Sequence, residues 1–195
     1  MNILFVNACI SANHPSRTSR LCEAYLNKCR KDGAQITTLN LEKMALKPFD
    51  ENMLKLRNAQ IENSDYAHEM FDLAKAFAEA DRIAVGAPYW DLSFPSALKV
   101  LVEHVMVTGI TFCYTDTGVK GLCKADELVY LTTSGGYIGE NNFGYDYMKA
   151  VAEMFGIERT RFYSAEGLDI IGNNVEDIMS EALENITKED EGENL

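Results

Sequence analysis

The sequence predicts a doubly wound α/β fold, with a five-stranded parallel sheet in the order 2-1-3-4-5 and helices on both faces. Short apolar runs alternate with longer amphipathic stretches along the chain, and such alternation is typical of βαβ units. The first run, residues 2–8, is apolar along nearly its whole length, as expected of a strand buried on both faces. Five such strands without an internal repeat favour the 2-1-3-4-5 order.

The five predicted strands are residues 2–8, 35–41, 82–87, 127–133 and 159–165. Pro88 ends the third strand because it has no N–H group to donate to a neighbouring strand. The last strand alternates arginine with aromatic residues, which favours a place at the edge of the sheet.

Apolar residues at helical spacing predict a helix after each strand. Gly33 ends the first helix, Pro95 lies in the first turn of the third, and Asn173 or Asn174 caps the last. The five apolar stripes are Leu21, Cys22, Tyr25, Leu26 and Cys29; Tyr66, Met70, Leu73, Ala74, Phe77 and Ala78; Leu98, Leu101, Val102, Val105 and Met106; Tyr147, Val151, Met154 and Phe155; and Val175, Ile178, Met179, Ala182, Leu183 and Ile186.

Two long connections interrupt this pattern. Residues 42–64 are expected to be irregular, with a short helical piece around residues 52–57, and residues 108–125 form a second insertion. Connections of this length are uncommon in a compact domain and often have a functional role.

Length and charge limit the classes of protein. The 195 residues predict a single domain over residues 1–187 and an acidic tail over residues 188–195, whose composition predicts disorder. A net charge of −12 argues against nucleic-acid binding. We expect no membrane contact and a cytoplasmic location, because the chain lacks a long apolar run and its start lacks the features of a signal peptide.

The cysteines and histidines predict neither disulfides nor a metal site. The five cysteines are Cys9, Cys22, Cys29, Cys113 and Cys123. An odd number without a C-x-x-C pair fits a reducing cytosol. Closely spaced pairs of histidine or cysteine are also missing from the sequence, so no metal ion is expected.

In a doubly wound sheet, ligands bind beyond the carboxyl ends of the strands. The loop after the first strand is rich in hydroxyls and opens into a helix, with Ser16, Thr18 and Ser19 near the helix start. Free N–H groups at a helix N-terminus suit a monophosphate, and the glycine motifs of nucleotide-binding loops are missing. Ordinary helix capping is the alternative, and Arg17 either pairs with phosphate or points to solvent.

The loops after the third and fourth strands complete the predicted site. Adjacent Tyr89 and Trp90 can cover a planar ligand, or else pack on the following helix. Gly135 and Gly136 allow close approach of the backbone, and their N–H groups can stabilise negative charge; the alternative is a plain turn. Three such loops at one edge of the sheet predict a site for a planar ligand that carries a phosphate.

With these three loops, the chain resembles a known family, the FMN-dependent NADH-azoreductases and NAD(P)H:quinone oxidoreductases of the flavodoxin-like superfamily. The resemblance implies a flavodoxin-like homodimer with two FMN sites near the subunit interface. It also implies a ping-pong cycle, in which NADH or NADPH delivers a hydride and a quinone or azo compound then accepts two electrons. The most specific stretches are residues 87–90, 95–99, 109–115, 121–122, 133–136 and 165–167.

The same resemblance assigns roles to individual residues. Phosphate and ribityl contacts fall on Cys9, Ser16, Arg17 and Thr18. Ring contacts fall on Tyr89, Trp90, Asp91 and Leu92, and on Thr133, Ser134, Gly135 and Gly136. Phe112 and Tyr114 would wall the substrate pocket. No side chain is assigned as nucleophile or general acid, because the flavin carries the chemistry.

Three positions depart from the family pattern. Cys9 stands where serine is frequent, which weakens one phosphate contact. Asp91 stands where asparagine is common, and a carboxylate beside the ring would lower the flavin potential. Ser134 stands where some members have arginine. These departures bear on azo reduction more than on FMN binding.

Three other functions remain open on the sequence alone. A flavodoxin-type electron carrier fits the acidic charge, although the two insertions favour an enzyme with a walled pocket. An NAD(P)H-dependent FMN reductase differs only in releasing its flavin at each turnover. A flavin-free sensing domain is possible on the same fold. The acidic charge slightly disfavours NADPH, which carries an additional phosphate.

Overall fold

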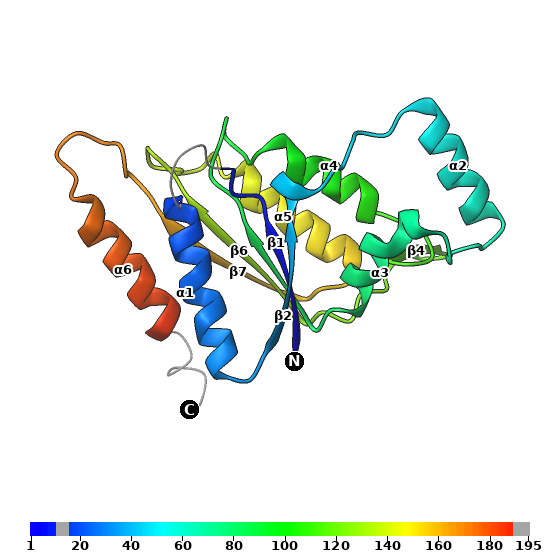
Figure 1. Ribbon diagram of the computed structural model, residues 1–195, viewed down its shortest axis with the longest axis horizontal. Helices are drawn as coiled ribbons and strands as arrows, with labels where there is room; N and C mark the ends of the chain where they lie inside the picture. The colour runs from blue at the N-terminus through cyan, green and yellow to red at the C-terminus, as the bar shows by residue number, and fades with distance from the viewer. Residues whose placement is uncertain (11–15, 189–195) are drawn as a thin grey trace.

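A five-stranded parallel sheet forms the centre of the molecule (Figure 1). The computed structural model describes residues 1–10 and 16–188. The strand order is β2-β1-β3-β6-β7, which confirms the predicted order for the five main strands. The strands are β1 (Asn2–Asn7), β2 (Gln35–Asn40), β3 (Arg82–Gly86), β6 (Glu127–Thr133) and β7 (Arg159–Ala165).

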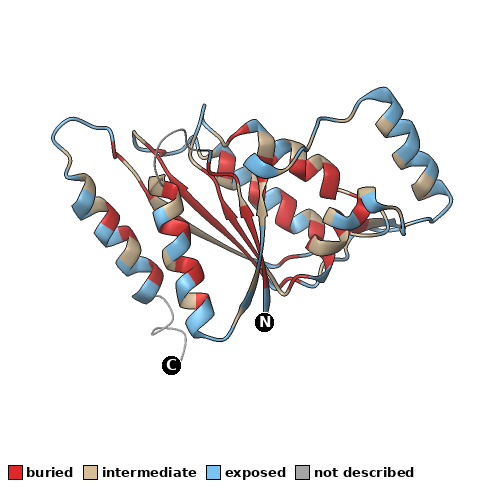
Figure 2. Cartoon of the chain, in the orientation of Figure 1, coloured by how far each residue is buried: buried red, intermediate tan, exposed pale blue. Residues whose placement is uncertain are grey.

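Both faces of the sheet are covered (Figure 2). Because side chains alternate along a strand, Ile3 and Phe5 of β1 join the hydrophobic cluster on one face, and Leu4 and Val6 join the cluster on the other. Every residue of β6 is buried, as the centre of such a sheet requires. Strands β2 and β7 form the two edges, so the prediction of an edge position for residues 159–165 is confirmed.

Two groups of helices cover the sheet. Helices α1 (Arg17–Lys31) and α6 (Val175–Lys188) pack on one face. Helices α3 (Asp72–Glu79), α4 (Ser96–Val105) and α5 (Phe143–Phe155) pack on the other. No described helix is both long enough and apolar enough to cross a membrane.

The helix boundaries refine several predictions. Pro95 is the residue before α4 rather than part of its first turn. Asn174 caps α6, since its side-chain oxygen accepts the N–H groups of Glu176 and Asp177 at 3.1 and 3.5 Å. Of the predicted tail, only Lys188 lies within the described residues, as the last residue of α6. The single domain over residues 1–187 stays a prediction.

The connection 42–64 is more helical than expected. It contains a short 3-10 helix (Leu41–Lys43) and the twelve-residue helix α2 (Glu51–Glu62), which extends away from the sheet (Figure 1). None of the residues of α2 is buried, so its sequence carries little apolar periodicity. The helix predicted after it is divided into a 3-10 turn (Glu69–Phe71) and α3.

The second insertion forms a β-hairpin that was not among the predicted elements. Its strands are β4 (Phe112–Thr115) and β5 (Gly118–Gly121), paired antiparallel. The hairpin is tied to the edge of the sheet where the strands begin: the N–H of Cys123 donates to the carbonyl of Phe155 at 3.2 Å, and the N–H of Lys124 donates to the carbonyl of Ala78 at 2.9 Å. That edge lies opposite the carboxyl ends of the strands.

Candidate functional site

The three predicted loops meet at one edge of the sheet. Strands β1, β3 and β6 are neighbours, and backbone hydrogen bonds continue past their ends. The N–H of Ala8 donates to the carbonyl of Gly86 at 2.8 Å, and the N–H of Tyr89 donates to the carbonyl of Thr133 at 3.0 Å. The parallel topology therefore brings the loops after β1, β3 and β6 side by side, as the sequence predicted.

The start of α1 combines a helix cap with free backbone donors. The Ser16 hydroxyl accepts the N–H of Ser19 at 3.0 Å and lies 2.8 Å from the Ser19 hydroxyl. Ser16 is therefore the N-cap of α1. Ordinary helix capping was the alternative to phosphate binding that the sequence left open. Helix geometry leaves the N–H groups of Arg17 and Thr18 without an acceptor inside the helix, so they are available to an anion. Residues 11–15 of this loop lie outside the described residues.

A buried pair of hydroxyls joins the first and third loops. The side-chain oxygens of Thr18 and Thr133 are 2.6 Å apart, and both residues are more than nine-tenths buried. This contact fixes the start of α1 against the end of β6. Thr18, which the resemblance assigns to the phosphate, and Thr133, which it assigns to the ring, are thus in direct contact.

Cys9 is buried directly after β1. Its N–H donates to the side-chain oxygen of Asn7 at 3.0 Å, and its thiol donates to the carbonyl of Gly86 at 3.6 Å. Hydrogen bonding from the Cys22 thiol lowers the pKa of Cys9; burial opposes this shift, and the hydroxyls of Ser19 and Ser16 add to it.

Arg17 forms an ion pair with a protein residue, whereas the sequence predicted that it pairs with phosphate or points to solvent. Its guanidinium donates to the Asp169 carboxylate at 2.7 Å and reaches the carbonyl of Leu168 at 3.5 Å. Both charged groups remain partly exposed, at 42% for Arg17 and 70% for Asp169. Asp169 follows β7 and was not among the predicted site residues.

The loop after β3 contains a tight turn with an uncommon backbone. Trp90 and Ser93 exchange two backbone hydrogen bonds, of 3.2 and 2.8 Å. The two residues between them, Asp91 and Leu92, have φ angles of 50° and 67°, a conformation that costs residues other than glycine roughly 1–2 kcal/mol each. Such strain is concentrated at functional sites.

This turn presents apolar side chains to solvent. Trp90 is 44% exposed and Leu92 is 50% exposed, so Trp90 is not buried against the following helix. Tyr89 is only partly exposed, and its hydroxyl donates to the carbonyl of Asn141 at 2.8 Å. The Tyr89 hydrogen bond thus links the turn to the segment after β6, while Trp90 and Leu92 expose apolar side chains.

The loop after β6 is held by the loop after β7. The N–H groups of Leu168 and Asp169 donate to the carbonyls of Ser134 and Gly135 at 3.1 and 2.9 Å. The Ser134 hydroxyl donates to the carbonyl of Gly136 at 2.6 Å. A Cβ atom on Gly135 would lie 2.5 Å from the Asp169 carboxylate, whereas one on Gly136 would meet no atom within 4 Å. The backbone therefore borders open space at Gly136.

Two predicted residues lie elsewhere. Phe112 is buried in the hairpin, and Tyr114 packs edge-on against it with ring centroids 5.6 Å apart. Tyr114 is 70% exposed. Since the hairpin is tied to the opposite edge of the sheet, the structure does not bring these two residues to the three loops.

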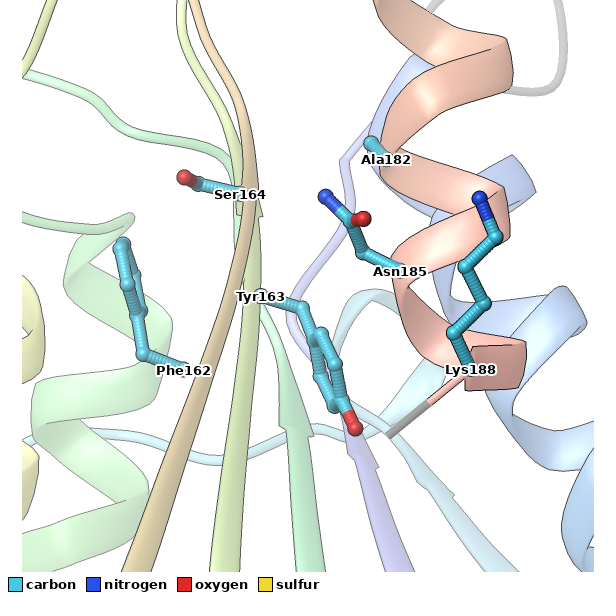
Figure 3. Close-up of a pocket in the computed structure, with 6 residues that line it drawn as sticks. All are labelled: Phe162, Tyr163, Ser164, Ala182, Asn185 and Lys188. Carbon is cyan, nitrogen blue, oxygen red and sulfur yellow. The ribbon is translucent and has the colours of Figure 1, made fainter. Parts of the chain in front are cut away.

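A hollow of about 320 Å³ lies between the edge strand β7 and helix α6 (Figure 3). Tyr163, Asn185 and Lys188 face this space, while Phe162 extends from the other side of the strand. It shares no residue with the three loops. Within residues 1–10 and 16–188, no group of three histidine, cysteine, aspartate or glutamate side chains is arranged to hold a metal ion.

Comparisons with known proteins agree with the sheet order. A family model described as "Flavodoxin-like fold" matches residues 1–189. The chain is 34% identical over 190 residues to FMN-dependent NADH:quinone oxidoreductase 2 of Clostridium acetobutylicum, covering 93% of this chain and 94% of the relative. It is 32% identical over 188 residues to the FMN-dependent NADH:quinone oxidoreductase of Coprothermobacter proteolyticus, with the same coverage.

Solved structures show the same fold. An azoreductase from Bacillus anthracis str. Sterne superposes with a TM-score of 0.85 at 22% identity, covering 96% of this chain and 97% of that chain. An FMN-dependent NADH-azoreductase from Bacillus anthracis str. Ames Ancestor, solved in complex with FMN, superposes with a TM-score of 0.77 at 20% identity. The second superposition covers 96% of this chain and 98% of the other.

Proposed function

The chain belongs to the flavodoxin-like family and is homologous over its length to FMN-dependent NADH:quinone oxidoreductases, and on this premise we propose that it is an FMN-dependent enzyme that oxidises NADH and reduces quinones or azo compounds. The observation that carries the proposal is the meeting of three loops around open space at Gly136, at the carboxyl ends of β1, β3 and β6. The fold places a ligand site at this edge.

The residues present fit FMN. The start of α1 offers free N–H groups to a phosphate, and the exposed turn at Trp90 and Leu92 offers an apolar surface to a ring. Gly136 provides a backbone edge with no side chain in front of it. The donor set and the exposed apolar side chains thus suit a planar ligand with one phosphate.

Each loop has a separate task in this proposal. Ser16, Arg17 and Thr18 hold the phosphate, with Cys9 beneath them. The segment 89–92 covers the ring, and the segment 133–136 binds its polar edge through backbone N–H groups. When bound, FMN supplies the redox chemistry, accepting a hydride from NADH and passing electrons to the acceptor. The protein positions the rings and limits access of water.

Anaerobic addition of NADH to the purified holoprotein tests the proposal. We expect the visible flavin absorbance to bleach without a reductase partner, and to return when menadione or an azo dye is added. A flavin that stays yellow would indicate an electron carrier instead. Flavin that separates from the protein on gel filtration during turnover would indicate an FMN reductase, and protein that binds no FMN would contradict the proposal.

We also propose a homodimer, which the position of the hairpin supports. Tyr114 is exposed but is tied to the edge of the sheet opposite its own loops. If a tyrosine from this hairpin walls the substrate pocket, it must be Tyr114 of the partner subunit. Sedimentation should then give a dimer, and Tyr114→Ala should raise KM for the quinone while leaving flavin content unchanged. A monomer with full activity would contradict this arrangement.

A cytosolic location is part of the same proposal. All five cysteines are free thiols in the structure, which supports a reducing compartment. NADH is the proposed electron donor, as the names of the relatives state for those proteins.

Replacing Asp91 by asparagine should raise the midpoint potential of the bound flavin. Asp91 lies in the exposed turn between Trp90 and Ser93, and reduction adds negative charge to the ring that a nearby carboxylate opposes. A unit charge at ~8 Å and an effective dielectric of ~40 contributes about 1 kcal/mol, which is about 20 mV for a two-electron couple. A spectroelectrochemical titration measures the shift.

Asp32→Asn is the matched control for this potential. Asp32 follows the C-terminal end of α1, far along that helix from the three loops, so its neutralisation should leave the potential unchanged. An equal potential in Asp91→Asn and the wild type would place the Asp91 carboxylate away from the ring.

A further inference from the structure

The Asp169 carboxylate lies between two residues that the proposed function assigns to opposite ends of FMN. One carboxylate oxygen is 2.7 Å from the guanidinium of Arg17, at the start of α1. The other lies against Gly135, so closely that a Cβ atom there would be 2.5 Å away. A ligand that reaches from the start of α1 to the loop after β6 therefore passes beside this negative charge.

The backbone fixes Asp169 in this position. Its N–H donates to the carbonyl of Gly135 at 2.9 Å, and the N–H groups of Leu168 and Gly167 donate to the carbonyls of Ser134 and Gly136 at 3.1 and 3.0 Å. The loop after β7 thus runs along the loop after β6, joined by three hydrogen bonds. These bonds hold the Asp169 backbone, from which the carboxylate extends, beside the loop after β6.

We propose that Asp169 competes with the phosphate of the cofactor for Arg17, and thereby limits the affinity of the protein for FMN while leaving its affinity for the flavin ring unchanged. The inference rests on the proposed function. It makes Asp169 a residue that determines specificity, although it comes from a strand whose loop is not one of the three that form the site.

The energetics favour an exchange of partners. Both side chains of the Arg17–Asp169 ion pair are exposed to solvent, and such ion pairs contribute little to stability. A phosphate forms stronger, charge-assisted hydrogen bonds with a guanidinium, so Arg17 turns from Asp169 to the phosphate when the cofactor binds. The carboxylate stays behind on its fixed loop, and its charge then repels the phosphate.

The test compares FMN with riboflavin, which has the same ring and ribityl chain but no phosphate. The full chain, freed of bound flavin, is titrated with each ligand, and the quenching of flavin fluorescence gives Kd. Asp169→Asn should lower Kd for FMN about three- to tenfold, as expected when one charge near a phosphate is removed. The value of Kd for riboflavin should stay the same.

Ionic strength and a matched variant distinguish electrostatic repulsion of the phosphate from a structural effect of the Asp169 substitution. The difference between Asp169→Asn and the wild type should shrink at high ionic strength, because screening weakens the repulsion. Glu176→Gln removes a similar exposed partner, that of Arg20 one turn further along α1, paired at 3.0 Å. This variant should change Kd for FMN by less than about twofold, since its charge is more distant and screened.

Three outcomes would overturn the inference. An unchanged Kd for FMN would show that Asp169 does not compete. Weaker binding of FMN alone would mean that Asp169 orients Arg17 toward the phosphate. Equally weaker binding of FMN and riboflavin would mean that the carboxylate accepts a ribityl hydroxyl. If the wild-type chain binds neither ligand, the proposed function fails as well, so the two failures are distinguishable.

Discussion

Replacing Gly136 by valine should leave the fold intact and weaken FMN binding by roughly a hundredfold or more, which corresponds to about 2.7 kcal/mol. A Cβ atom at Gly136 meets no protein atom within 4 Å, and its backbone is not in the left-handed region that requires glycine. The protein itself thus leaves space where the new side chain begins. The proposed flavin ring occupies the same space, so the methyl groups and the ring exclude each other.

Two measurements on this variant separate folding from binding. The flavin-free protein should melt at the same temperature as the flavin-free wild type, and fluorescence titration should show the loss of FMN affinity. Gly136→Ala is the graded control, because a single methyl group should cause a smaller loss. If Gly136→Val binds FMN as the wild type does, the open space beside this loop is not the flavin site.

Much of the fold could be predicted because the central strands are buried on both faces. Residues 127–133 match the central strand β6 at both ends, because burial on both faces leaves an apolar run that is easily recognised. Residues 159–165 match the edge strand β7, whose sequence mixes arginine with aromatic residues instead. Helix α2 and the β4–β5 hairpin lack this signal. No residue of α2 is buried, and most residues of the hairpin are exposed, so neither segment shows an apolar period.

The candidate site, like the fold, has parts that could be predicted from the sequence and parts that could not. The loops that contain Ser16, Trp90 and Gly136 could be predicted to meet because each loop follows a strand, and parallel topology alone brings the ends of such strands together. Asp169 could not be predicted, because it reaches Arg17 across 152 positions of the chain. Its position depends on how the loop after β7 pairs with the loop after β6, and composition does not encode that pairing.

The edge of the sheet opposite the site depends on one buried carboxylate. Glu127, the first residue of β6, is only 3% exposed and pairs with Arg82 of β3 and Arg161 of β7, each at 3.0 Å. Removing one partner of a buried ion pair costs about 3–5 kcal/mol. Both arginine side chains are 21% exposed, so water compensates part of this cost.

Glu127→Gln should therefore lower the free energy of unfolding by about 2–4 kcal/mol, since two neighbouring guanidinium groups lose their shared counter-charge. Urea unfolding of the flavin-free protein measures this change. Asp126→Asn is the matched control: Asp126 is the adjacent residue and pairs with Arg159 at 2.8 Å, but both side chains are more than half exposed. Its effect should stay below about 1 kcal/mol.

Glu127→Gln also tests whether the starts of the strands and the loops at their carboxyl ends are structurally independent. Glu127 lies at the start of β6, and the Thr133 contact to Thr18 lies at its end, so the loss of the carboxylate leaves the three loops in place. Below its melting temperature, Glu127→Gln should bind FMN as tightly as the wild type. Equal stability of Glu127→Gln and Asp126→Asn would contradict the role of the buried carboxylate. A parallel loss of FMN affinity in the folded protein would show instead that the starts of the strands position the loops at their ends.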